Sequence, residues 1–274
     1  MYCQFYGLKE KPFNVTSDPA FFFLSKKHNE ALSHLIYGVS QRKGIIVITG
    51  EIGTGKTTLC RFFLNQLDKS IKTALILNPY FSETQLLEAI ARDFGINIKS
   101  KTKLALAWEL NKFLLRESEL GHNVLLIIDE AQNLKPRILE QVRLLSNLET
   151  EKEKLLQIVL IGQPELNETL DLTELRQIRQ RVMVRYHILP LDKEEIKEYI
   201  YHRLKIAGPQ NRIEFMNEAI EKIAMFSKGT PRLINMLCDR ALLAGFARGT
   251  NTIDSNLINK CTEELKSYCV GEEG

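Results

Sequence analysis

Five short apolar runs divide the first two thirds of the chain. Most of them lack the alternation of apolar and polar residues that marks a strand with one solvated face, so we expect both of their faces to be buried. Stretches with helical periodicity separate the runs. This order predicts an α/β fold with a five-stranded parallel sheet and helices on both faces. The runs are 45–49, 73–77, 124–128, 155–161 and 182–188.

Some of the helical stretches carry clear start and stop signals. Ser82 and Gln85 have the spacing of a capping box before LLEAIARDFG, and Gly95 suits the end of that helix. Asp192 and Glu195 repeat the capping spacing further along the chain. The sequence therefore predicts helices that begin just after Ser82 and Asp192.

The pattern changes after Pro190, because every later segment has a helical period and no further strand-like run occurs. Pro231 stands where the first turn of one of these helices is expected. We expect a small all-helical lid domain after the sheet domain. The predicted organisation is an N-terminal segment 1–43, a core 44–190, a lid 191–269 and a tail 270–274.

Composition narrows the class of protein only slightly. The 274 residues carry a formal net charge of +3, which gives no support to a nucleic-acid partner and does not rule one out. Five cysteines without a CxxC pair suggest neither a disulfide framework nor a zinc site, and they fit a reducing cytosol. The N-terminus lacks a signal-peptide pattern, and no run approaches the roughly 18 residues of a membrane span.

The stretch GEIGTGKT follows the first apolar run and precedes a helical stretch, and it has the spacing of a phosphate-binding loop. Its glycines let backbone N–H groups surround phosphate oxygens, and the positive end of the following helix points at them. Lys56 would reach the outer phosphates, and the hydroxyl of Thr57 would hold Mg²⁺. The alternative is a glycine-rich turn with a surface lysine. The loop residues are Gly50, Glu51, Ile52, Gly53, Thr54, Gly55, Lys56, Thr57 and Thr58.

Polar residues follow three of the predicted strands. Asp129 and Glu130 end the run VLLII, where Asp129 would face the metal and Glu130 would polarise the attacking water. Gln163 follows IVLIG and would contact the γ-phosphate or the water, and Asn78 would hold Glu130 away from its working position. The carboxyl ends of strands are the usual ligand edge of open α/β sheets. The alternatives are a solvated acidic turn and ordinary turn amides.

Two arginines are candidates for contact with the phosphates. Arg181 lies just before the fifth run, and its guanidinium would act in the site of a neighbouring subunit. Arg232 lies in the first turn of a lid helix, where it would couple the γ-phosphate to the lid. The alternative for Arg181 is a surface charge, and the alternative for Arg232 is a surface ion pair at a helix start.

The ordered set of phosphate loop, DEAQNL, glutamine-ended fourth strand, QRV and GTPRLIN resembles an AAA+ ATPase. The segments LLQIVLIGQPEL and PRLINMLCDRALLAG are similar to the ATPase domain of the general secretion pathway protein A family. The resemblance extends from Tyr2 to about Tyr268.

This resemblance implies ATP and Mg²⁺ as cofactors, and a homo-oligomer that forms with nucleotide. It makes Gln163 the first sensor, Arg181 the finger and Arg232 the second sensor, although many AAA+ proteins carry Asn, Ser or Thr in place of Gln163. It also implies that the N-terminal segment folds over the adenine through Phe13 and Asn14. Packing in the core is the alternative for the phenylalanines of that segment.

The family's role implies a cytoplasmic ATPase at the inner membrane that works with a secretion or envelope-assembly partner. Family members are usually anchored by a membrane helix, and this chain stops after the lid. Two alternatives stay open. One is an ATP-dependent DNA-binding transposition regulator, and the other is a nucleotide-gated scaffold with little turnover.

Overall fold

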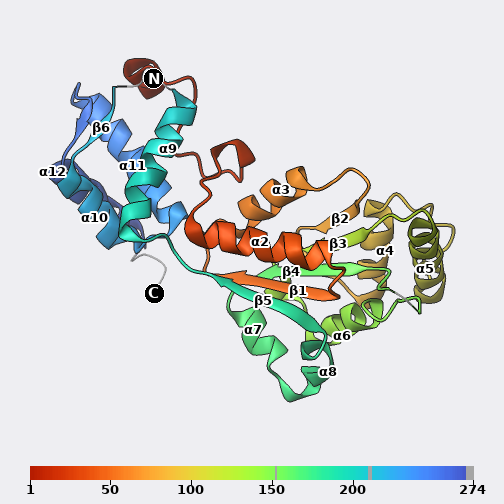
Figure 1. The fold of residues 1–274 in the computed structure, drawn as a ribbon. Helices are drawn as coiled ribbons and strands as arrows, with labels where there is room; N and C mark the ends of the chain where they lie inside the picture. The colour runs from red at the N-terminus through yellow and green to blue at the C-terminus, as the bar shows by residue number, and fades with distance from the viewer. Residues whose placement is uncertain (152, 209–211, 270–274) are drawn as a thin grey trace. The chain divides into compact units, whose positions relative to one another are not determined.

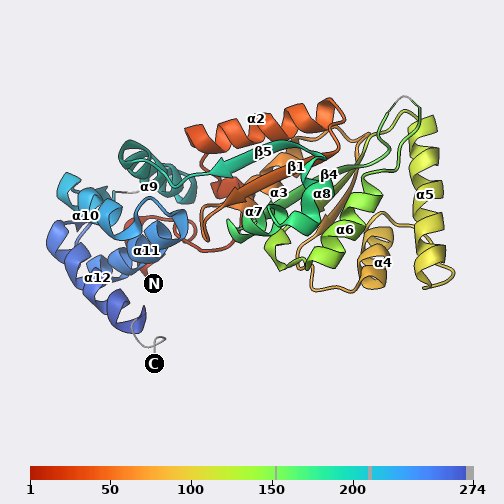
Figure 2. The same ribbon diagram turned by 90° about the horizontal axis from the view of Figure 1, so that it is seen from below.

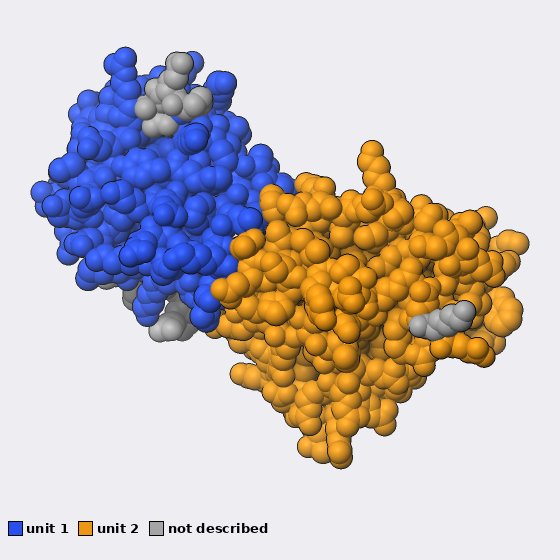
Figure 3. Space-filling model, in the orientation of Figure 1, with its two compact units in different colours: residues 1–27, 53–58, 189–274 blue, residues 28–52, 59–188 orange. Residues whose placement is uncertain are grey.

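The computed structural model describes residues 1–151, 153–208 and 212–269, and Figure 1 shows their fold. The chain forms two compact units, which Figure 3 colours blue and orange. Unit 1 comprises Met1–Lys27, Gly53–Thr58 and Leu189–Gly274, and unit 2 comprises His28–Ile52 and Leu59–Ile188.

Unit 2 is built on a parallel sheet with the strand order β2-β3-β4-β1-β5. The predicted five-stranded sheet is therefore confirmed. Because all the strands run in one direction, their carboxyl ends lie at one edge of the sheet. The strands are β1 (Ile45–Gly50), β2 (Lys72–Ile76), β3 (Val124–Ile128), β4 (Gln157–Gly162) and β5 (Val182–Ile188).

Helices cover both faces of this sheet, as the sequence predicts. Figures 1 and 2 show α2 on one side of the strands and α6 and α7 on the other. Among the described residues, seven helices have most of their residues in unit 2, and α2 and α3 begin in residues of unit 1. The helices are α2 (Lys26–Ser40), α3 (Lys56–Gln66), α4 (Glu83–Asp93), α5 (Lys103–Glu119), α6 (Pro136–Leu145), α7 (Glu165–Leu170) and α8 (Arg176–Arg179). Short 3₁₀ turns occur at Ala131–Asn133 and Thr173–Leu175.

The core of unit 2 is aliphatic. Every residue of β1, β3 and β4 is buried, which is why these runs lack alternation. Helix α2 lies very close to β1 at Gly38, where a Cβ atom would come within 2.4 Å of the Cδ1 atom of Ile46. A residue larger than glycine would push α2 off the sheet at this point.

Unit 1 is mainly helical. It holds α1 (Tyr2–Tyr6), a 3₁₀ turn at Pro19–Phe21, α9 (Lys193–Ala207), α10 (Asn217–Ser227), α11 (Pro231–Ala247) and α12 (Ser255–Cys269). The expected all-helical lid also contains a parallel pair of two-residue strands, β6 (Glu214–Phe215) and β7 (Thr252–Ile253). Two residues are too few for strand periodicity, so the sequence pattern did not reveal this pair. The tail 270–274 lies outside the described residues.

The N-terminal segment is divided between the two units. Residues 1–27 pack in the core of unit 1, where the hydroxyl of Tyr6 donates a hydrogen bond to the carbonyl oxygen of Leu242 over 3.0 Å. Residues 28–43 belong to unit 2 and contribute most of α2. The segment 1–43 therefore does not behave as one piece, because its two parts bury their apolar residues in different cores.

Both predicted capping boxes are confirmed. At α4, the backbone N–H of Gln85 donates to Ser82 Oγ over 3.4 Å, and the N–H of Ser82 donates to Gln85 Oε1 over 2.8 Å. At α9, the N–H of Glu195 donates to Asp192 Oδ1 over 2.8 Å, and the return bond measures 3.2 Å. Local sequence therefore determined both helix starts.

Candidate functional site

The phosphate loop predicted from GEIGTGKT connects β1 to α3. Gly53 and Gly55 have φ values of +81° and +95°, which side chains other than hydrogen rarely allow. Lys56 begins α3 and is 7% exposed, and Thr54 is 1% exposed. The backbone therefore has the strand, glycine turn and helix start that a phosphate-binding loop requires.

The first turn of α11 touches this loop within unit 1. The N–H of Arg232 donates to the carbonyl oxygen of Gly53 over 3.2 Å. A Cβ atom at Gly53 would lie 2.6 Å from the Cβ of Arg232 and 3.2 Å from Thr230 Cγ2, so only glycine fits here. The side chain of Arg232 is exposed, and it forms no ion pair with a described residue.

Asp129 and Glu130 lie at the carboxyl end of β3. Asp129 is 2% exposed, and its N–H donates to the carbonyl oxygen of Ile76, the last residue of β2, over 2.8 Å. Glu130 has a left-handed backbone with φ 53°, and its N–H donates to Asp129 Oδ1 over 2.9 Å. This turn ends the strand with two adjacent carboxylates at the ligand edge of the sheet.

The structure brings Gln163 to Glu130 but does not bring Asn78 there. Glu130 Oε2 accepts a hydrogen bond from Gln163 Nε2 over 3.4 Å and one from Gln132 Nε2 over 2.6 Å. Asn78 is exposed, and within the described parts of the chain it makes no hydrogen bond to Glu130. The amides that hold this carboxylate in the structure are those of Gln132 and Gln163.

Gln132 is a site residue that the sequence analysis missed. It lies two residues after Glu130 in the motif DEAQNL, on the 3₁₀ turn Ala131–Asn133. The hydrogen-bonding capacity of its amide, beside a carboxylate that ends a strand, is the signal that points to it. Only the fold shows that its amide reaches both Glu130 and the end of β4.

Arg181 lies at the opposite edge of the sheet. It precedes β5, and its carbonyl oxygen accepts a hydrogen bond from the N–H of Ile45 at the amino end of β1. The six residues of β1 separate this edge from Gly50 by about 17–20 Å at the usual rise per residue. Arg181 therefore lies far from the carboxyl edge of its own sheet.

Phe13 and Asn14 differ in their surroundings. Phe13 is 1% exposed and packs edge-on against Phe215, with 6.4 Å between ring centroids. Its ring is thus part of the unit 1 core, the alternative noted from the sequence. Asn14 is exposed, and its carbonyl oxygen accepts a hydrogen bond from Arg203 over 3.0 Å.

Cys60 on α3 is not a candidate nucleophile. It is 1% exposed. Burial, together with the negative charge of Asp129, raises the pKa of its thiol to about 12. The thiol is therefore neutral at physiological pH, and it serves as an apolar packing group.

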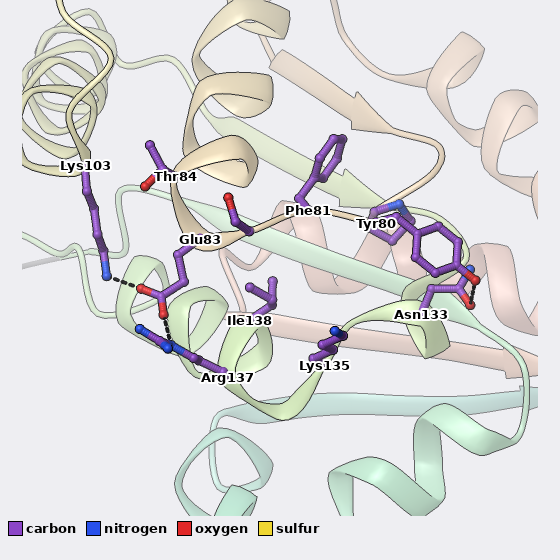
Figure 4. A pocket seen from close by; sticks show the side chains of 11 residues that line it. Tyr80, Phe81, Glu83, Thr84, Lys103, Asn133, Lys135, Arg137 and Ile138 are labelled. Carbon is purple, nitrogen blue, oxygen red and sulfur yellow. Dashed lines mark hydrogen bonds and ion pairs between the residues drawn. The ribbon is translucent and has the colours of Figure 1, made fainter.

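A pocket lies at the same edge of the sheet, beside the ends of β2 and β3. Figure 4 shows this pocket of about 680 Å³, with Lys103 and Arg137 both pairing with Glu83 at one end and Tyr80 donating to Asn133 Oδ1 over 3.2 Å at the other. Hydrogen bonds from Lys103 and Arg137 hold the pKa of Glu83 below its usual range. None of the residues predicted to bind nucleotide lines this pocket.

Two features are absent from the described residues. No helix among them combines the length and apolar character that a membrane crossing needs. No three His, Cys, Asp or Glu side chains among them group closely enough to hold a metal ion by themselves.

Comparison with known proteins defines the class. Residues 39–170 match the family model described as an AAA domain. The fold resembles ORC2 of Aeropyrum pernix, solved as ADPNP-ADP complexes, with a TM-score of 0.65, 15% identity, and coverage of 88% of this chain and 67% of that one. It also resembles Cdc6p of Pyrobaculum aerophilum, with a TM-score of 0.70, 18% identity, and coverage of 89% and 70%. Residues 39–170 therefore form an AAA domain, and the fold is that of an AAA-type P-loop NTPase.

Sequence similarity to one relative is much stronger. The chain is 46% identical over 275 aligned residues to General secretion pathway protein A of Aeromonas hydrophila. The match covers 100% of this chain and 50% of the relative, so the chain spans about half of that protein's length. The resemblance to this family that the motifs suggested is therefore confirmed.

Proposed function

We propose that the protein binds and hydrolyses ATP and that hydrolysis drives a step of secretion or envelope assembly. The observation that carries the proposal is the end of β3, where Asp129 is followed by Glu130. The carboxylate of Glu130 accepts hydrogen bonds from Gln132 and from Gln163, which follows β4. β1, which leads into the glycine loop, pairs with β4 on its other side. Glu130 serves as the general base toward the attacking water.

Mg²⁺ fits the oxygen donors at this site. Thr57 supplies a hydroxyl and Asp129 a carboxylate, and this magnesium chemistry uses one or two protein ligands together with the substrate phosphates. Bound there, Mg²⁺ would supply positive charge that offsets the negative charge of the phosphates. The remaining steps belong to the chain: Lys56 and the loop amides hold the phosphates, and Glu130 takes the proton of water.

Arg181 acts in the site of a neighbouring subunit. Its place at the amino edge of the sheet, about 17–20 Å from the loop that follows β1, supports a role in trans over one in cis. Turnover then requires a homo-oligomer, because the arginine that stabilises the transition-state charge comes from the next copy. Arg232, exposed at the start of α11, senses the γ-phosphate for the lid.

The biological setting follows from the relative alone. The name of the relative, General secretion pathway protein A, refers to a secretion pathway. We therefore propose a cytoplasmic ATPase that works at the inner membrane with a partner of such a pathway. Asn14 is proposed to border the adenine. Asn78 is proposed to hold Glu130 away from its working position until a partner binds.

The test compares Glu130→Gln, Lys56→Ala and Arg181→Ala with wild type in ATP turnover and nucleotide binding, across a range of protein concentrations. Glu130→Gln should lose about 100-fold or more in turnover and keep nucleotide binding, whereas Lys56→Ala should lose binding. Arg181→Ala should lose about 1,000-fold, and wild-type specific activity should rise with concentration. Glu119→Gln and Arg176→Ala, both exposed and outside the site, are the matched controls.

Other outcomes identify the alternatives. Tight nucleotide binding without turnover at any concentration would favour the nucleotide-gated scaffold. Salt-dependent binding of duplex DNA at physiological ionic strength, with turnover stimulated by DNA, would favour the transposition regulator. Equal turnover in wild type and Glu130→Gln would contradict the proposed role of this glutamate.

A further inference from the structure

The side-chain amide of Gln132 links Glu130 to the end of β4. Its Nε2 donates to Glu130 Oε2 over 2.6 Å, and its Oε1 accepts from the backbone N–H of Gln163 over 3.0 Å. Both polar atoms of the amide are therefore used, one on each partner. All three residues belong to unit 2, so one sheet edge holds the whole arrangement.

The two amides on Glu130 differ in strength. The contact from Gln132 is 2.6 Å long, whereas the contact from Gln163 Nε2 is 3.4 Å and close to the limit for a hydrogen bond. A short bond to a carboxylate is charge-assisted and is the stronger kind. Gln132 is therefore the main holder of Glu130, and the side chain of Gln163 can turn toward a phosphate at little cost.

The bonds also distinguish the two oxygens of the carboxylate. Both amides donate to Oε2 of Glu130, and Oε1 makes no hydrogen bond with any residue in the described ranges. A carboxylate held by one oxygen presents the other in a fixed direction. Oε1 is thus the atom left to accept a proton from water.

The backbone around Gln132 is fitted to this arrangement. A Cβ atom at Gly162, the last residue of β4, would lie 3.0 Å from Gln132 Oε1 and 3.2 Å from the backbone nitrogen of Gln132. The left-handed turn at Glu130, with φ 53°, brings the chain back so that Gln132 faces β4. A side chain at position 162 would displace the amide that holds Glu130.

We propose that Gln132 is a positioning residue for hydrolysis: it orients Glu130 Oε1 toward water and joins the base to Gln163, the predicted γ-phosphate contact. This inference rests on the proposed ATPase function. Gln132 touches no reacting atom and acts through Glu130. Its loss should lower kcat and leave nucleotide binding intact, because the phosphate loop does not involve it.

The experiment measures kcat, KM and nucleotide affinity for Gln132→Ala, with Asn133→Ala as the matched control on the same 3₁₀ turn. We expect kcat to fall about 10- to 100-fold in Gln132→Ala, with KM within about threefold and Asn133→Ala near wild type. A rise in KM with unchanged kcat would overturn the inference. A kcat within twofold of wild type would also overturn it. Absence of turnover in wild type itself would instead sink the proposed function.

Two further variants separate positioning from folding. Gln132→Glu places a second carboxylate against Glu130, and two close carboxylates share a proton at low pH. Its activity relative to wild type should therefore rise as the pH falls, which a general folding defect would not produce. Gly162→Ala keeps Gln132 but crowds its amide, so it should lower kcat in the same direction while nucleotide affinity stays unchanged. A pH profile parallel to wild type would count against the proposal.

Discussion

The cores of the two units are held together by different interactions. In unit 2, β1, β3 and β4 are buried along their whole length by aliphatic side chains, and the functional polar groups lie at the strand ends. In unit 1, the core contains a buried arginine, Arg203, which is 6% exposed. A charged side chain buried in a hydrophobic core is costly unless it is hydrogen-bonded, so the guanidinium of Arg203 needs hydrogen-bond partners where it lies.

Arg203 on α9 holds the N-terminal segment. Its Nε donates to the carbonyl oxygen of Pro12 over 2.5 Å, and Nη2 donates to that of Asn14 over 3.0 Å. Its Nη1 donates to the hydroxyl of Tyr199 over 3.0 Å, and that hydroxyl donates to Asn235 Oδ1 on α11 over 2.8 Å. Burial raises the pKa of Tyr199, so the phenol stays neutral and both donates and accepts.

The two units are therefore specified by interactions of different directionality. Aliphatic packing in unit 2 is non-directional, so a sheet of this kind needs only the right pattern of apolar residues. In unit 1, one guanidinium fixes two backbone carbonyls of a segment that is distant in sequence, and hydrogen bonds are directional. The N-terminal segment is therefore placed by a polar network as well as by its aromatic residues.

The largest expected effect comes from removing Arg203. Arg203→Ala leaves two carbonyls and the Tyr199 hydroxyl without their donor in a buried place, which should lower the free energy of unfolding by about 3–5 kcal/mol. Amide hydrogen exchange should quicken in residues 1–27 and α9. The comparison variant Leu126→Ala opens a cavity in β3, should cost about 2–5 kcal/mol, and should quicken exchange in the sheet.

Arg203→Lys sharpens this contrast. A lysine keeps the positive charge but cannot donate along three directions in one plane, so it should restore only part of the lost stability. If Arg203→Ala quickened amide hydrogen exchange equally in both units, the hydrogen bonds of Arg203 would not stabilise unit 1 in particular.

A smaller effect is expected at the two capping boxes, one in each unit. Ser82→Ala and Asp192→Ala should each lower the free energy of unfolding by about 1 kcal/mol in urea titrations. The loss should be larger for Asp192→Ala, because Glu195 of that box also accepts a hydrogen bond from the N–H of Lys26 over 2.8 Å. Equal losses would show that this link to the N-terminal segment adds nothing measurable.

The smallest effect at neutral pH concerns Glu117 in unit 2. The hydrogen bond from His122, over 2.8 Å, and that from Arg116, over 2.7 Å, hold the pKa of this carboxyl below its usual value of 4.5. Glu117 is buried, at 3% exposure. At neutral pH, Glu117→Gln should cost about 1 kcal/mol or less, because Arg116 is mostly exposed.

The sign of the pH dependence follows from the direction of that shift. A carboxyl with a lower pKa in the folded chain binds fewer protons there, so it adds stability above its unfolded value of 4.5. That stability is lost as the pH falls through the folded-state value. Unfolding titrations between pH 7 and pH 3 should show a smaller loss of unfolding free energy with acid for Glu117→Gln than for wild type. Identical pH dependence in the two proteins would exclude this contribution of Glu117.

Much of the fold could be predicted from local patterns. The apolar runs gave the five strands, and the capping spacings gave the starts of α4 and α9, because burial and capping depend on residues near in sequence. The glycines of the phosphate loop were found for the same reason. Gln132 escaped prediction because its amide pairs with the backbone N–H of Gln163, which lies 31 positions away.

The sequence by itself determined the parallel sheet, the glycine turn after β1 and the carboxylates after β3, since each depends on a short stretch of chain with its own physical preference. Tertiary packing determines which groups meet: the Gln132 side chain with the carboxylate of Glu130 and the backbone N–H of Gln163, and the Arg203 guanidinium with the carbonyl oxygens of Pro12 and Asn14. Packing also places Phe13 in the core of unit 1. These contacts join residues far apart in the chain, and only packing brings such residues together.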